Sequence, residues 1–176
     1  MLALCSCNQT PRVTFENRCS LMDPPLKHGV KHSLLDARMH FITPNVNWTI
    51  SENEYGFVAG DPSLGYINAI SLTERNYEGN WDWDQETNYL LKNLDDNPQV
   101  QVIESYFGQF QDKMAYETLV LENHQLNTQL AKLTYSFINE ELKKSFVLSL
   151  VVQADSNYEH RICDLIPIAK TIELKN

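Results

Sequence analysis

The sequence predicts an α+β protein in which helices pack on an antiparallel β-sheet. Three observations lead to this prediction. Four long segments between residues 100 and 153 carry the clearest β signal, apolar and polar side chains alternate in 129–138 and 145–153, and short polar connections join the segments. One amphipathic helix is expected before these segments and another after them. The expected strands come in runs rather than in strict alternation with helices, which favours an antiparallel sheet over a parallel one.

Short strands are expected in the first part of this sheet. Residues 37–44 place apolar side chains at alternate positions and end at a proline, as a strand does. Residues 49–62 predict two short strands on either side of a turn at Asn53-Glu54. Residues 65–76 alternate again, so a further strand should follow.

The first amphipathic helix should begin after Asp82, a good N-cap residue with Gln85 three positions later. Its apolar residues fall on one stripe, and Asn97-Pro98 should end it. The second helix should begin at Tyr158 and should end or kink at Pro167. Between the two helices lie the four segments with the strongest β signal, residues 100–107, 113–121, 129–138 and 145–153, which we expect to form a meander.

Length and charge limit the classes of function. A chain of 176 residues suits one domain, and we expect residues 1–36 to form an N-terminal stub and irregular arm and residues 37–176 the single domain. The chain has 14 basic and 23 acidic residues, a net charge of −9, which argues against nucleic acid as a partner because phosphate binding needs clustered cations. No window approaches the ~20 apolar residues of a membrane-spanning helix.

The N-terminal residues Leu4, Ser6 and Cys7 resemble a bacterial lipobox, with an apolar residue three positions before the cysteine and a small residue directly before it. This match predicts lipidation of Cys7 and attachment to a membrane through the lipid alone. Only six residues precede Cys7, which is shorter than a secretory signal. An ordinary, frayed N-terminus is therefore the alternative interpretation.

The remaining cysteines do not suggest a metal site. The Cys5 and Cys7 pair has C-x-C spacing with no second pair of ligands, so a zinc site is not expected. Cys19 and Cys163 could form a disulfide in an oxidising compartment, but spacing alone leaves their pairing open.

Candidate chemistry is sparse in the rest of the chain. His28 and His32 could share a helix face and hold a metal, but Gly29 and nearby prolines disfavour a helix and no further ligand completes the set. We therefore expect no metal, no cofactor and no catalytic residues. In the Trp-Asp-Trp-Asp stretch at 81–84, one tryptophan should pack the helix on the sheet, which leaves Trp81 as a possible contact with a partner.

The order of elements, the stretch FITPNVNWTI and the C-terminal SFVLSLVVQADSNYEHRICDLIPIAKTIEL resemble the PsbP/Mog-like superfamily, including the bacterial DcrB-like lipoproteins. The resemblance implies an α/β/α sandwich around an antiparallel sheet. It also implies a role in binding other proteins, since members bind a photosystem in chloroplasts, a small GTPase in eukaryotes and unknown partners in bacterial envelopes. The family has no shared catalytic motif, so the resemblance assigns no functional residue.

Together these observations predict a non-enzymatic lipoprotein of the bacterial envelope, in the periplasm, that binds another protein and belongs to a larger assembly. Two alternatives stay open. One is a module that binds a small ligand or metal between the sheet and the arm, and the other is a cytoplasmic chaperone or effector-like protein. The identity of the partner, the oligomeric state and the true start of the chain do not follow from the sequence.

Overall fold

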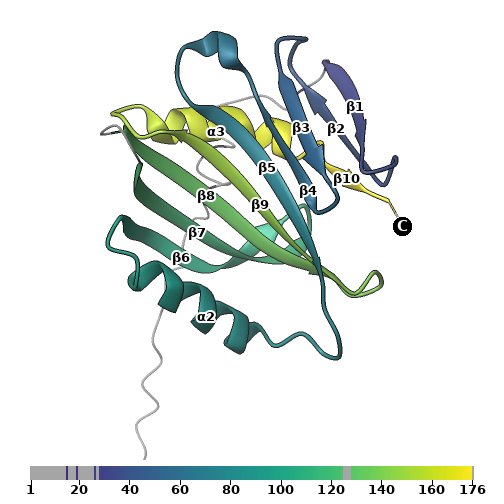
Figure 1. The fold of residues 1–176 in the computed structure, drawn as a ribbon, viewed down its shortest axis with the longest axis vertical. Helices are drawn as coiled ribbons and strands as arrows, with labels where there is room; N and C mark the ends of the chain where they lie inside the picture. The colour runs from purple at the N-terminus through teal and green to yellow at the C-terminus, as the bar shows by residue number, and fades with distance from the viewer. Residues whose placement is uncertain (1–14, 16–18, 20–25, 27, 125–127, 176) are drawn as a thin grey trace, which may run out of the picture.

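The structure is a computed structural model that describes residues 15, 19, 26, 28–124 and 128–175 (Figure 1). In chain order its elements are β1 (Val30–Leu34), β2 (Met39–Thr43), β3 (Thr49–Asn53), β4 (Gly56–Gly60), a 3-10 turn (Pro62–Leu64), β5 (Asn68–Asn76), α2 (Trp83–Asp95), β6 (Val100–Phe110), β7 (Lys113–His124), β8 (Thr128–Asn139), β9 (Lys144–Gln153), α3 (Tyr158–Ala169) and β10 (Glu173–Leu174).

The main sheet has seven strands in the order β3-β4-β5-β9-β8-β7-β6, and all its neighbours run antiparallel. Strands β6 to β9 form the predicted meander, and β5 pairs with the last of them, so the earlier strands extend the same sheet. A smaller sheet, β1-β2-β10, lies beside it (Figure 1). The predicted α+β fold class is confirmed.

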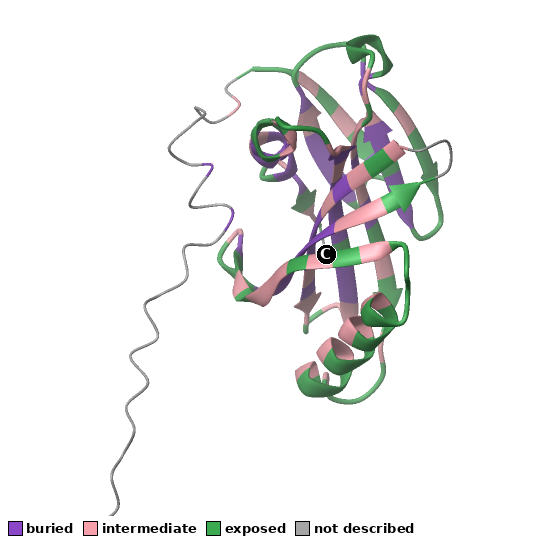
Figure 2. Ribbon diagram, turned by 90° about the vertical axis from the view of Figure 1, so that its left-hand side faces the viewer, coloured by how far each residue is buried: buried purple, intermediate pink, exposed green. Residues whose placement is uncertain are grey.

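The two helices lie on opposite faces of the main sheet (Figure 2). Helix α3 packs on β9, β5 and β2, and it buries Ile162, Leu165 and Ile166 against the apolar face of the sheet. Helix α2 packs on β6 on the other face and has no fully buried residue, as its colours in Figure 2 show. The hydrophobic core therefore fills the α3 side, and the α2 side is a thinner layer.

The predicted helices form close to their expected limits. The Asp82 carboxylate accepts a hydrogen bond from the Gln85 backbone N–H at 3.0 Å, which satisfies one of the free donors at the start of α2. Pro167 lies inside the last turn of α3, and the helix ends two residues later, at Ala169. This position is consistent with the predicted stop, because a proline removes one hydrogen bond from the helix that precedes it.

The division of the chain at residue 36 falls inside the first hairpin. Strand β1 lies within the segment that we assigned to an arm, yet it pairs with β2 over its whole length. Phe15 and Cys19 are 1% and 4% exposed and belong to the core. The described parts of residues 1–36 therefore pack with the domain rather than lie off it.

An ion cluster joins three separate segments at one end of the sheet. The Glu74 carboxylate on β5 accepts hydrogen bonds from Arg38 Nη1 at 2.9 Å and from Lys144 Nζ at 2.6 Å. Burial by itself would raise the pKa of Glu74, but the hydrogen bonds and charges of Lys144 and Arg38 outweigh it and hold the pKa below its ordinary value of 4.5.

We expect Glu74→Gln to lower the free energy of unfolding by about 1 kcal/mol at neutral pH. A carboxyl group whose pKa is lower in the folded protein than in the unfolded chain stabilises the folded state fully at pH values above its unfolded pKa. This stabilisation is lost as the pH falls through its folded pKa. The difference between wild type and variant should therefore shrink as the pH falls from 6 towards 3, measured by urea unfolding at each pH. A difference that stays constant across this range would contradict the assignment.

The β6–β7 turn holds two residues in the left-handed backbone region. Gln111 and Asp112 have φ angles of 50° and 64°, and Gln111 Nε2 donates to the carbonyls of Lys170 and Ile172 at 2.7 and 3.1 Å. This turn therefore also fastens the end of α3 to the sheet. The second position of such a turn favours glycine, because only glycine adopts positive φ without a steric cost.

We expect Asp112→Gly to raise the stability by up to about 1 kcal/mol and Asp112→Ala to lower it. The aspartate tolerates the left-handed conformation better than alanine does, so the two variants should move in opposite directions. The midpoint of urea unfolding tests this pair, and a shift of the same sign in both would show that the backbone conformation is not the cause.

Candidate protein-interaction groove

A groove lies between α2 and the face of the main sheet that α3 does not cover. Its volume is about 260 Å³. Most of its accessible lining is apolar, and the side chains come from the helix, from the loop before it and from four strands. These residues are Thr73, Arg75, Trp81, Trp83, Glu86, Thr87, Tyr89, Leu90, Tyr116, Ser136, Phe137, Ser145, Phe146 and Val147. We call this site the α2 groove.

Hydroxyl groups form a row on the sheet face beside the α2 groove. Five strands place a serine or threonine in register on this face, and antiparallel partners point to the same side of a sheet. The row runs through Ser71, Ser149, Thr134, Thr118 and Ser105. A row of hydroxyls offers little apolar area for a helix to bury, so this face of the sheet does not form a second hydrophobic core.

A row of five aromatic rings runs along the groove, and three of them, Trp81, Trp83 and Tyr116, line it. Tyr77, Trp81, Trp83, Phe107 and Tyr116 follow one another edge to face, with ring centroids 4.9 to 5.7 Å apart. Tyr116 is buried, whereas Phe107 is 49% exposed and both tryptophans are half-buried. Such contacts hold the rings in fixed orientations, so the helix and β6 present a rigid aromatic surface to solvent.

Exposed apolar side chains add to this surface; Val147 and Tyr89 line the groove, and Met114 lies outside its lining. Val147 is 41% exposed, Met114 51% and Tyr89 65%, and the first two point to the α2 face by the alternation of β9 and β7. Aromatic residues and methionine are enriched in protein interfaces. The α2 face therefore has the composition of an interaction surface.

The structure places Trp81 in the wall of the groove rather than fully in solvent. Its Nε1 atom is buried and has no hydrogen-bond partner among the described atoms. The Arg75 guanidinium lies 5.6 Å from the centre of the Trp81 ring and pairs with Glu86 at 3.0 Å. The assignment of Trp81 as a partner contact stays a prediction, and Trp83, Phe107 and Tyr116 extend the surface to which it belongs.

A second, polar hollow adjoins the groove and shares Trp81 with it. It has a volume of about 320 Å³ and is lined mainly by polar atoms from the loop before α2 and from the first turn of α2. Its lining includes three carboxylates, those of Glu78, Asp82 and Glu86, and one guanidinium, that of Arg75. We call this site the acidic hollow.

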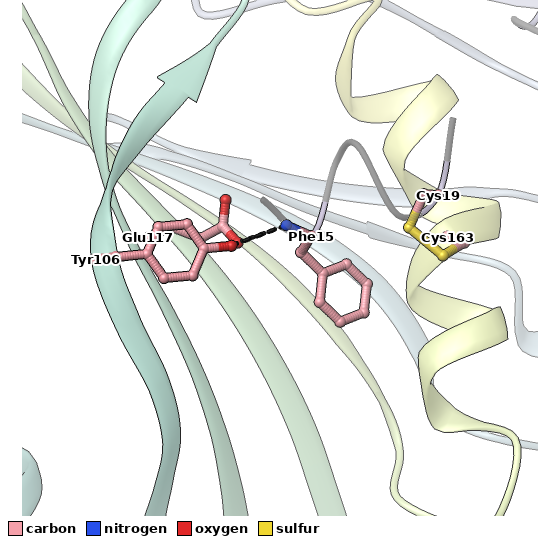
Figure 3. The surroundings of a disulfide bond; sticks show 5 residues. All are labelled: Phe15, Cys19, Tyr106, Glu117 and Cys163. Atoms are coloured by element: carbon pink, nitrogen blue, oxygen red, sulfur yellow. Dashed lines mark hydrogen bonds between the residues drawn. A yellow bond between two sulfur atoms is a disulfide. The ribbon is translucent and has the colours of Figure 1, made fainter. Parts of the chain in front are cut away.

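The other predicted site residues lie elsewhere. Cys19 and Cys163 form a disulfide that joins the N-terminal segment to α3 (Figure 3). Cys7 and its predicted lipidation lie outside the described residues. His32 is in β1, where its Nε2 contacts Thr43 Oγ1 at 2.8 Å, so the helix that a His28–His32 pair would need is not formed. The described part of the chain contains no group of three His, Cys, Asp or Glu residues placed to hold a metal.

The place expected for a ligand between sheet and arm is filled by the protein itself. The Phe15 side chain lies between the sheet and α3, and its backbone N–H contacts Tyr106 Oη at 2.8 Å and Glu117 Oε1 at 3.2 Å (Figure 3). The Tyr106 hydroxyl donates to the buried Glu117 carboxylate. Burial and this neighbouring carboxylate raise the pKa of Tyr106. The sequence did not indicate this buried polar contact.

Among the described helices, none combines the length and apolar character needed to cross a bilayer. No protein-family model and no curated protein sequence matches this chain.

Solved structures identify the fold. Cyanobacterial PsbP (CyanoP) from Synechocystis is 13% identical, with a TM-score of 0.59 over 82% of this chain and 91% of its own. The Ran-binding protein Mog1p from Saccharomyces cerevisiae is 11% identical, with a TM-score of 0.56 over 84% and 95% of the two chains. The fold is that of the PsbP/Mog-like superfamily. The resemblance inferred from the sequence is confirmed at this level, and its DcrB-like subgroup stays a prediction.

A third PsbP/Mog-like structure is LpqN from Mycobacterium tuberculosis, described as involved in cell envelope biogenesis. It is 12% identical, with a TM-score of 0.50 over 78% of this chain and 83% of its own. At these identities the comparisons establish the fold of the PsbP/Mog-like domain alone.

Proposed function

We propose that this PsbP/Mog-like domain is a non-enzymatic component of the bacterial envelope that binds another protein through the α2 groove. The proposal rests on the surface around the α2 groove. This surface combines a rigid row of aromatic rings, exposed apolar side chains around the row, and a sheet face on which α2 packs with no fully buried residue of its own. Aromatic side chains fixed in such positions supply most of the affinity in protein interfaces.

Two further observations support an envelope location. The Cys19–Cys163 disulfide suits an oxidising compartment such as the periplasm, because cytosolic thiols are kept reduced. Among the neighbours in fold, LpqN is described as involved in cell envelope biogenesis. Lipidation of Cys7 would hold the domain at a membrane there. Mass spectrometry of the protein from its native host should find acyl groups on Cys7, and an unmodified N-terminus would rule out the anchor.

Photo-crosslinking in the native host tests partner binding. A photoreactive amino acid replaces Met114, which lies beside the groove two positions before Tyr116 on β7, or, as a matched control, Val46, which is 80% exposed in the loop between β2 and β3. We expect a discrete adduct with one protein from position 114 and none from position 46. Adducts of equal yield from both positions, or none from position 114, would contradict the proposal.

A further inference from the structure

We propose that the α2 groove and the acidic hollow together bind a proline-rich segment of the partner protein that carries a lysine or arginine beside the prolines. This inference rests on the proposed function and names the chemistry of the bound segment. Proline rings would lie in the α2 groove, and the cation would lie in the acidic hollow.

The row of aromatic rings suits a polyproline II helix, which is rigid and extended, with three residues per turn and a rise of 3.1 Å per residue. Neighbouring ring centroids from Tyr77 to Phe107 are 5.0 to 5.7 Å apart, and the ring planes meet at 66° to 88°. The row leads from the acidic hollow, which Tyr77 and Trp81 line, to Trp83 in the α2 groove. The notches between perpendicular rings accept flat, rigid side chains, and aromatic-lined grooves are the usual receptors for proline-rich segments.

The indole N–H of Trp81, in the wall of the α2 groove, provides a second argument for a proline-rich segment. Trp81 Nε1 is buried without a partner in the described structure, and a buried donor left unpaired costs free energy. A polyproline II helix has no internal hydrogen bonds, so its carbonyl oxygens are available as acceptors. A rotation of the Trp81 side chain towards the groove would let a bound segment supply the missing acceptor, which an alkyl chain cannot do.

The charges next to the groove favour a basic residue in the bound segment. In the acidic hollow Glu86 pairs with Arg75, and Lys143 Nζ lies beside the hollow, where it donates to the Gly79 carbonyl at 3.2 Å. Glu78 and Asp82 remain as exposed carboxylates among the lining residues. The net charge of the chain, −9, also attracts a basic segment at longer range. An anionic lipid headgroup would meet repulsion here, so the charge pattern favours a peptide over a fatty acid.

Indole N–H signals of the full chain provide the test. The chain has three tryptophans, and Trp48, which is 8% exposed and lines neither hollow, is an internal control. The probes are a peptide of eight prolines with an arginine at each end, the same peptide with glutamate at each end, an arginine-flanked glycine-serine peptide of equal length, and lauric acid.

We expect the arginine-flanked proline peptide to shift the Trp81 and Trp83 signals in a saturable way and to leave Trp48 unchanged. The glutamate-flanked peptide should bind several-fold more weakly, and the glycine-serine peptide should give no saturable shift. Trp81→Phe keeps a ring but removes the donor and should weaken binding. Glu78→Lys should weaken it too, whereas Glu54→Lys, in the β3–β4 turn, should not.

Three results would overturn the inference: no shift with the arginine-flanked proline peptide, an equal shift with the glycine-serine peptide, or a shift with lauric acid alone. The last would assign the groove to an acyl chain. If the Met114 crosslink to a partner persists while the proline peptide fails, the proposed function stands and only the identity of the bound segment is wrong.

Discussion

Removing the Cys19–Cys163 disulfide by the double substitution Cys19→Ala/Cys163→Ala is expected to lower the free energy of unfolding by about 3–5 kcal/mol. The bond joins residues 144 positions apart, so it closes a loop that contains nearly the whole domain. Cross-links that close long loops restrict the unfolded chain most, although the gain measured for a given disulfide often falls below the entropic estimate.

Urea unfolding of the oxidised wild type and the double variant measures this effect, and a reducing agent provides the control. The reductant should bring the wild type close to the double variant and should leave the variant unchanged. Alanine is used at both positions because both side chains are buried in the core and a serine hydroxyl there would add its own desolvation cost. A loss below about 1 kcal/mol would show that the cross-link contributes little.

In the wild-type background, Phe15→Ala is expected to lower the free energy of unfolding by about 3–5 kcal/mol, the usual range for removing a buried phenylalanine. The ring is 1% exposed and lies in the core between the sheet and α3. Without it the cavity would open beside the buried Glu117 carboxylate, to which the Phe15 backbone N–H is hydrogen-bonded. Tyr55→Ala, at a side chain 59% exposed in the β3–β4 turn, is the control and should change stability by less than about 1 kcal/mol.

The two changes should also be coupled. Phe15 and Cys19 are four residues apart, and the disulfide holds this part of the chain on α3. In the Cys19→Ala/Cys163→Ala background, Phe15→Ala should therefore cost less than in the wild type. A double-mutant cycle measures the difference, and strictly additive losses would show that the disulfide does not position Phe15.

Much of the fold could be predicted because its signals are local. The strands of the meander alternate apolar and polar side chains over ten or more residues, and Asp82 and Asn97-Pro98 mark the ends of α2. Strand β1 was not predicted because the centre of its sequence, VKHSL, is polar and shows no strand pattern. It forms through backbone pairing with β2. Strand β10, with two residues, is too short to give a periodic signal.

Long-range contacts account for the rest. Phe15 lies in a largely polar stretch of the sequence, so only the folded chain shows that its side chain enters the core. The hydroxyl row needs the register of five strands before it can be recognised. The tryptophans at 81 and 83 drew attention in the sequence, but Phe107 and Tyr116, which continue the row of rings, come from strands β6 and β7.

Binding of the crosslinked partner to purified variants tests the central claim most directly. Phe107→Asp places a charge directly beside Trp83 and Tyr116 of the groove, whereas Val46→Asp introduces the same charge at an exposed position away from it. Truncation or charge at an aromatic anchor commonly costs more than about 2 kcal/mol, so calorimetry should show Phe107→Asp weakening the complex at least about tenfold, with Val46→Asp unchanged. Equal affinities for wild type and Phe107→Asp would place the interface elsewhere on the domain and contradict this account.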